Sequence, residues 1–466
     1  MMLDQEYLFW GGGVLLYNNQ YAKVENNCMT NVRLGVQTGN FHQANPGAAT
    51  FQRIENNSIQ ARRRGIFHNL FNTTASPYTI TNNTITGLAN ANETAVWDGI
   101  LLSSLADAIH IASNNTINGS AISIPRTGIS VWNDQTAPLI SGGTITGVDL
   151  GINVNNFEGY PTAGSNAGNT FATIDGGTIT GATIAGIKVN DNVLNTNNAT
   201  VSVIIKGNTI INNTTTGLWI NGGDATLSFF GATPASFLNQ ATYIDQTSNG
   251  TNAPSTNIDA TAVSFDGQTG LTGSFAQLFT IEDKINHKID WKALGFVLVK
   301  ANNDYVTDIN AGQTAVNNDY TRLRNAVEQA SNNWTINLKG SFNWVETNAA
   351  NSWALGNDGV VSPSDDYSIL IPANINGITF TAPEGLSTAS INGPGDLPAV
   401  NLEGVLVFDG GDNQNWTISN MEFKEFDLSI GMFNGAGGTD AFNNTTITTN
   451  TFNIATDLNA VAALQM

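Results

Sequence analysis

Charged residues are sparse in this chain, and few are spaced so that they could act together. Asp98, Asp107 and His110 fall on adjacent predicted strand segments, and Arg126 follows on a later one. A carboxylate or imidazole of suitable pKa, beside a cation, could abstract a proton from an acidic sugar. Asp98, Asp107 and Arg126 are therefore candidate catalytic residues, and the alternative is that they lie in solvated loops.

A second group of carboxylates follows a predicted strand near the C-terminus. Asp409 and Asp412 are separated by two glycines in the sequence Asp-Gly-Gly-Asp-Asn-Gln-Asn. Clustered oxygen ligands on a glycine turn suit Ca²⁺. Calcium is thus a possible cofactor here, and a polar turn between strands is the alternative. The four histidines show no metal-ligand spacing.

The only basic run in this acidic chain is Arg62, Arg63 and Arg64, which precedes Gly65. The run could face an acidic sugar or a neighbouring carboxylate. A solvated face is the simpler interpretation, because charged side chains are mostly exposed.

Three tryptophans lie next to recurring glycines. Trp97 precedes Gly99, whereas Trp132 and Trp219 follow glycines. If the three indoles gather on one face, they could stack against sugar rings, and the alternative is that they pack in the core. They are candidate binding residues together with the arginine run.

A repeat between Val24 and Leu218 must position the candidates in the first half of the chain. Each copy reads apolar residue, two polar residues, Asn or Gly, a small residue and an apolar residue, and then closes on a glycine before an apolar pair. The closing glycines are Gly35, Gly65, Gly99, Gly128, Gly151, Gly186 and Gly217, at spacings of 30, 34, 29, 23, 35 and 31 residues. A period in this range indicates a solenoid.

The repeat predicts short strands, as in Gly-Ile-Asn-Val-Asn at 151–155 and Gly-Ile-Lys-Val-Asn at 186–190. Their apolar residues alternate with polar ones, which is the period of a half-buried strand. Paired asparagines recur at 26–27, 56–57, 82–83 and 114–115. If the coils stack in register, these side chains can form an amide ladder.

The Ile-x-x-Asn-x-Ile and Gly-Ile-x-Val-x-Asn motifs resemble those of the pectate-lyase-like superfamily over residues 20–223. The resemblance implies an all-β fold, a right-handed parallel β-helix. It is weak for activity, since that fold hosts lyases, hydrolases, adhesins and phage tailspikes. The residue set of the polygalacturonases is absent.

Three parts are predicted. Residues 1–223 form the C-terminal part of a first β-helix, 224–320 a bridge with a short helix and strands, and 321–466 the N-terminal part of a second β-helix. Residues 321–330 carry the clearest helical stripe and predict a capping helix. The segment Phe279–Thr307 resembles inter-repeat segments of large secreted surface proteins of the Bacteroidetes type.

The composition of the chain limits which kinds of molecule it can bind. The net charge is −20 and only 12% of residues are charged, which argues against nucleic acid and anionic membranes because both attract basic patches. The single cysteine, Cys28, excludes a disulfide framework. No apolar run reaches the length of a membrane span, and no secretory signal is recognisable, so we expect a fragment of a longer extracellular or outer-surface protein.

Two functions follow from these patterns. The first is a secreted or cell-surface structural or adhesive protein that contacts polysaccharides or cell-surface glycans without catalysis. The second is a polysaccharide lyase or glycoside hydrolase acting on acidic polysaccharide. An enzyme should gather charged side chains in an open groove, whereas a structural protein should show uncharged polar ladders there.

Overall fold

The computed structural model describes residues 11–17, 22–39, 52–70, 78–89, 93, 95–104, 110–156, 168–191, 199–247, 256–309, 311–313, 317–343, 367–371, 375–393, 404–409, 413–426, 428–433, 442–453 and 462–465. The chain divides into two compact units, Met1–Thr269 (unit 1) and Gly270–Met466 (unit 2). The division falls inside the range that the sequence assigns to the bridge, and the predicted boundaries at 223 and 320 stay predictions.

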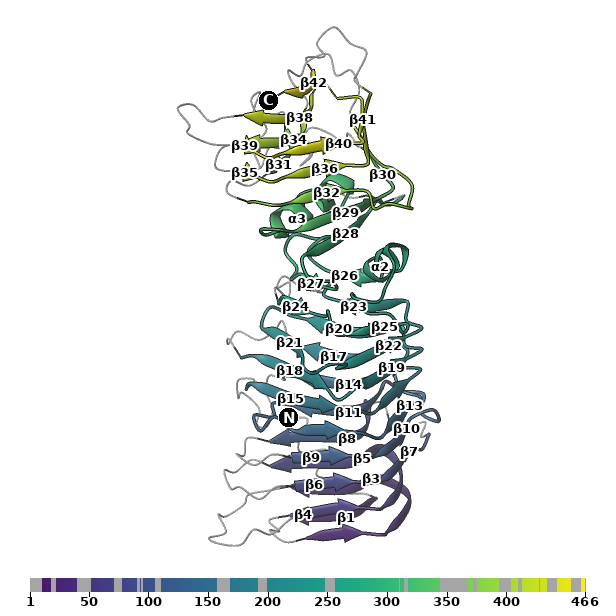
Figure 1. Cartoon of the computed structure of the whole chain (residues 1–466). Helices are drawn as coiled ribbons and strands as arrows, with labels where there is room; N and C mark the ends of the chain where they lie inside the picture. The colour runs from purple at the N-terminus through teal and green to yellow at the C-terminus, as the bar shows by residue number, and fades with distance from the viewer. Residues whose placement is uncertain are drawn as a thin grey trace. The chain divides into compact units, whose positions relative to one another are not determined.

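Unit 1 is built from parallel strands stacked in three columns (Figure 1). The first column consists of β2 (Lys23–Glu25), β4 (Gln52–Glu55), β6 (Tyr78–Thr81), β9 (His110–Ser113), β12 (Leu139–Ser141), β15 (Thr170–Asp175), β18 (Val201–Lys206) and β21 (Ala225–Phe229). The second consists of β7 (Thr84–Gly87), β10 (Thr116–Asn118), β13 (Thr144–Thr146), β16 (Thr178–Thr180), β19 (Thr209–Asn212), β22 (Ala235–Leu238) and β25 (Ser264–Phe265).

The third column consists of β1 (Gly12–Tyr17), β8 (Trp97–Ser104), β11 (Arg126–Trp132), β14 (Leu150–Asn155), β17 (Ala185–Asn190), β20 (Thr216–Asn221) and β23 (Thr242–Asp245). The long strands β3 (Cys28–Gly39) and β5 (Ser58–Leu70) run through the second and third columns, and β24 (Ile258–Asp259) completes the unit. Each coil from β2 to β23 contributes one strand to each column, so the predicted all-β parallel solenoid is confirmed.

The closing glycines lie in the third column, where a neighbouring coil leaves no room for a side chain. A Cβ on Gly99 would lie 2.5 Å from Ile117 Cγ2 and 2.6 Å from the carbonyl oxygen of Gly128. The same pair of obstacles, an inward isoleucine and the next glycine's carbonyl, recurs at Gly65, Gly128 and Gly151. Any side chain there would overpack the core, which explains why glycine recurs.

The paired asparagines have two different roles. The first of each pair, such as Asn56 or Asn82, has a positive φ of 57° or 54° and turns the chain, a conformation that asparagine tolerates better than most residues. The second forms the predicted ladder. Asn83 Nδ2 donates to Asn115 Oδ1 at 3.0 Å and to the carbonyl of Ile54 at 2.8 Å, and Asn83 Oδ1 accepts from Asn57.

The coils continue past the point where the sequence repeat fades near residue 224. Strands β21, β22, β23 and β25 pair in parallel with the coil before them. Their inward residues remain apolar and buried, including Leu227, Phe237, Tyr243 and Phe265. Buried apolar residues therefore continue the coils beyond the last copy of the Asn and Gly motif.

Unit 2 begins with α2 (Phe275–Glu282), β26 (Ile285–Asn286), β27 (Val297–Leu298), β28 (Asn303–Thr307) and α3 (Asp319–Gln329). The strands that follow are β29 (Thr335–Lys339), β30 (Ser341–Asn343), β31 (Tyr367–Ile371), β32 (Thr379–Thr381), β33 (Ala389–Asn392), β34 (Gly404–Asp409), β35 (Asn413–Gln414), β36 (Thr417–Ser419), β37 (Met421–Lys424), β38 (Leu428–Phe433), β39 (Phe442–Asn443), β40 (Thr446–Thr448), β41 (Thr451–Asn453) and β42 (Ala462–Gln465). From β28 onward they again stack in parallel columns.

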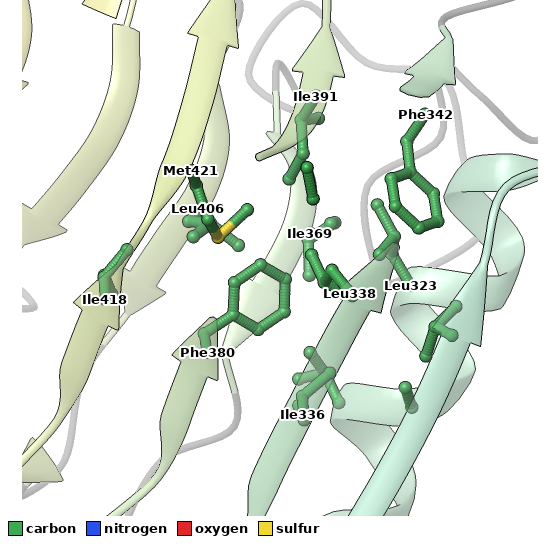
Figure 2. Packing of buried hydrophobic residues seen from close by; sticks show 14 of the residues in the cluster. Leu323, Ile336, Leu338, Phe342, Ile369, Phe380, Ile391, Leu406, Ile418 and Met421 are labelled. Carbon is green, nitrogen blue, oxygen red and sulfur yellow. The ribbon is translucent and has the colours of Figure 1, made fainter. Parts of the chain in front are cut away.

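The helix predicted over 321–330 is confirmed as α3. It starts two residues earlier because Asn318 caps it, accepting from the Thr321 N–H at 2.8 Å. Its buried face includes Leu323, which packs in one cluster with inward strand residues such as Ile336, Phe342 and Ile369 (Figure 2). This face is thus part of the hydrophobic core of unit 2, and the capping role stays a prediction. Among the described residues, none of the helices has the length and apolarity needed to cross a bilayer.

Candidate functional site

Asp98 and Arg64 form an ion pair on the neighbouring strands β8 and β5. Arg64 Nε donates to Asp98 Oδ2 at 3.2 Å, and Ser130 Oγ donates to Asp98 Oδ1 at 2.6 Å. The exposed fractions of the Arg64 and Asp98 side chains are 2% and 0%. The guanidinium also lies 4.7 Å from the ring centroid of Phe67 and 5.7 Å from that of Trp132. Asp98 therefore bridges coils within a buried cluster.

The rest of the basic run does not join this cluster as one charged patch. Arg62 donates to the side-chain oxygen of Asn31, and Arg63 donates to the carbonyl of Val96. The three arginines thus bond to three different parts of unit 1, and Arg63 and Arg64 are both buried.

Arg126 pairs with Asp149, a residue that the sequence did not single out. Arg126 Nη2 lies 3.1 Å from Asp149 Oδ1, and the Arg126 N–H donates to Asp149 Oδ2 at 3.1 Å. Burial alone would raise the pKa of Asp149, but hydrogen bonds from Thr183 and Arg126 lower it overall. Asp107, which the sequence grouped with Asp98, lies outside the described residues.

His110 lies inside the coils, not with Asp98. Its ring meets that of His68 edge to face, with centroids 4.5 Å apart, and its Nδ1 lies 3.5 Å from Asp134 Oδ2. Both histidines are buried. The described charged groups of unit 1 that drew notice in the sequence are thus paired, and several are buried.

Trp97 is a core residue. Its side chain is fully buried, and its Nε1 donates to the carbonyl of Ala61 at 3.1 Å. A Cβ on Gly119 would lie 3.2 Å from the indole, so glycine makes room for the ring. Trp97 does not share a face with the other two tryptophans.

Trp132 and Trp219 instead point outward from the third column and remain partly exposed. We call the surface to which they belong the outer amide face. It is formed by alternating residues of β11, β14, β17 and β20, namely Trp132, Asn153, Asn155, Lys188, Asn190, Trp219 and Asn221. Neighbouring strands repeat about every 4.8 Å, and residues two apart on one strand are about 6.7 Å apart. The face is therefore a regular grid.

An amide ladder forms one row of this grid. Asn190 Nδ2 donates to Asn155 Oδ1, and Asn221 Nδ2 donates to Asn190 Oδ1, both at 2.6 Å. In the other row Lys188 Nζ lies 3.8 Å from the ring centroid of Trp219, and Trp219 Nε1 donates to the carbonyl of Thr247 at 3.2 Å. The sequence signal for these residues was the third and fifth positions of segments such as Gly-Ile-Asn-Val-Asn at 151–155 and Gly-Ile-Lys-Val-Asn at 186–190.

The predicted calcium group falls mostly beyond the described residues. Asp409 is the last residue of β34, but its side chain is not among those described, and Asp412 lies outside the described residues. Within the described part of the chain, no three His, Cys, Asp or Glu residues are grouped as metal ligands. Calcium at Asp409 and Asp412 stays a prediction.

Unit 2 holds buried titratable groups that sequence patterns did not reveal. His287 Nε2 lies 2.8 Å from Glu282 Oε1, and His287 Nδ1 accepts the Val297 N–H at 3.0 Å, so the ring is the neutral tautomer with its proton on Nε2. Burial raises the pKa of Glu282 despite this imidazole. Burial, reinforced by the charge of Glu282, raises the pKa of Asp304 well above its usual range.

We expect Asp304→Asn to stabilise unit 2 at neutral pH and to flatten its pH dependence. Folding raises the pKa of this carboxyl, so its contribution to stability is fully present below the pKa that it has in the unfolded chain. That contribution is lost as the pH rises through the pKa that it has in the folded protein. Hydrogen exchange of peptides covering β28, measured between pH 4 and 8, should show more protection in the variant at the upper end. Asp283→Asn, an exposed change, is the control, and equal slopes for wild type and Asp304→Asn would refute the expectation.

The sequence was compared with known proteins. No family model matches the chain, and no curated protein matches it.

Proposed function

We propose that this chain is a non-catalytic segment of a secreted or cell-surface β-solenoid protein, structural or adhesive in role, that contacts glycans through the outer amide face. We expect the chain to belong with the pectate-lyase-like superfamily in fold. We also expect its bridge to be related to those of surface proteins of the Bacteroidetes type. The observation that carries it is the grid of amides and indoles on β11, β14, β17 and β20.

The chemistry of this face suits sugars. Asparagine side chains offer both donors and acceptors to hydroxyl groups. Indoles supply flat apolar surface and one N–H. The strand spacing of about 4.8 Å is similar to the length of one sugar in an extended chain, so successive sugars along the stacking direction would meet equivalent side chains.

The placement of the charged residues favours binding over catalysis. A lyase or hydrolase needs an acid or base within hydrogen-bond reach of its substrate. The candidates Asp98 and Arg126 are instead engaged by Arg64 and Ser130 and by Asp149, respectively. An uncharged amide ladder of Asn155, Asn190 and Asn221 runs along β14, β17 and β20 of the same column.

We expect Trp219→Ala to weaken glycan binding by about 10- to 30-fold, as truncation of a central aromatic contact usually does, and Trp132→Ala to weaken it less. Affinity electrophoresis in gels containing neutral and acidic polysaccharides measures the effect. Phe230→Ala is the matched control, since Phe230 is an exposed aromatic residue that follows β21 in the first column. Ultraviolet absorbance of unsaturated products after incubation with polyuronates would reveal a lyase, and product release would overturn the proposal.

A further inference from the structure

Lys188 is a cation whose charge no described carboxylate compensates. Its ammonium lies over Trp219 at 3.8 Å, and burial lowers its pKa with no acidic group contributing to the shift. By contrast, Lys206, Lys292 and Lys424 pair with carboxylates at 3.4, 2.8 and 2.8 Å. In a chain with 37 acidic and 17 basic residues, a partly buried lysine without such a partner marks a place where an anion would be favourable.

Further polar groups flank the ammonium on the outer amide face. Asn153 lies beside Lys188 on the next strand, and its Oδ1 is buried without a hydrogen-bond partner among the described residues. Asn155 Oδ1 ends the amide ladder as an acceptor, while within the described part of the chain its Nδ2 donates to no protein atom. The Asn153 oxygen is buried, so the groups that two neighbouring strands offer to a ligand are the Lys188 ammonium and the Asn155 amide donor.

This set fits a carboxylate and adjacent hydroxyl groups. An ammonium and an amide N–H can both donate to a carboxylate, and hydrogen bonds to charged acceptors are about twice as strong as neutral ones.

The net charge of the chain limits how much negative charge the ligand can carry. At −20, the protein repels a dense polyanion at long range. A single carboxylate is attracted to Lys188 and adds only one negative charge for the acidic protein to repel. The ligand that meets both conditions is a largely neutral glycan with isolated acidic groups.

We propose that Lys188 determines specificity on the outer amide face by anchoring isolated carboxylate groups of an otherwise neutral glycan. The inference rests on the proposed function, because it requires that this face bind glycans at all. Asn155 completes the subsite, and Trp219 fixes the position of the ammonium.

Three polysaccharides of graded charge test the proposal: xylan without acid groups, glucuronoxylan with sparse uronic acids, and polygalacturonate. We expect the wild-type chain to bind glucuronoxylan about tenfold more tightly than xylan and more tightly than polygalacturonate. Lys188→Met should reduce the ratio of the two xylan affinities to about one, and added salt should reduce the wild-type ratio because it screens the charge contact. Lys206→Met, which removes a lysine of the first column, should leave the ratio as it is.

The outcomes separate the two proposals. Equal affinity of the wild type for xylan and glucuronoxylan would overturn the role of Lys188 while the glycan-binding face stands. Preference for polygalacturonate would overturn the requirement for isolated charges. Failure to bind any of the three, with the chain folded by circular dichroism, would remove the proposed function and this inference with it.

Discussion

Asp98→Asn should lower the free energy of unfolding of unit 1 by about 4 kcal/mol, the cost typical of removing one partner of a buried ion pair. The amide keeps the shape of the carboxylate and can still accept from Ser130. However, Arg64 loses the carboxylate that lies 3.2 Å from its Nε in a site with almost no exposure. Urea unfolding followed by far-ultraviolet circular dichroism measures the loss.

Two further variants show whether burial of charge is the cause. Asp149→Asn breaks the half-buried pair with Arg126, where the side-chain exposed fractions are 20% and 21%, and should cost less than about 1 kcal/mol. Arg64→Met combined with Asp98→Asn leaves no charge in the site and should recover much of the stability. If Asp98→Asn is as mild as Asp149→Asn, the Arg64–Asp98 pair does not stabilise the coils.

Asn83→Leu should lower the free energy of unfolding by about 3 kcal/mol, because leucine has the same branching of side-chain heavy atoms but leaves buried backbone and amide groups of the two adjoining coils unsatisfied. Asn83 is fully buried, donates to Ile54 and Asn115, and accepts from Asn57. Protection against hydrogen exchange should fall most in peptides that contain β5, β7 and β10.

The adjacent Asn82 provides the matched control. Its side chain is exposed and its φ is 54°, a conformation that glycine adopts at little cost. Asn82→Gly should therefore change the stability only slightly. Comparable losses for both variants would show that the turn matters rather than the ladder.

Periodicity predicts the features of this fold that depend on neighbouring coils. The repeated glycines and paired asparagines indicated parallel stacking and the amide ladder, because each must meet its own equivalent one coil away. The last coils of unit 1 were not evident, since Phe237 and Phe265 fill the interior without the motif. Large aromatic rings replace the isoleucine pattern there.

The candidate site was only partly predictable, because the inward or outward direction of a side chain depends on its distance from the closing glycine. Trp132 and Trp219 lie four and two residues after their glycines and point outward, whereas Trp97 lies two residues before Gly99 and is buried. The cation at Lys188 and the raised pKa of Asp304 depend on which groups surround them in space. No pattern along one sequence contains that information.

The spacing between closing glycines ranges from 23 to 35 residues, yet the strands that carry them remain in register from coil to coil. Differences in length are thus absorbed between strands, and the hydrogen bonds of each asparagine of the ladder reach no further than the adjoining coils. A whole coil can then be duplicated or deleted during evolution, because the same contacts form again at the new junction. Related proteins would differ in the number of coils, while the contacts between adjacent coils stay chemically the same.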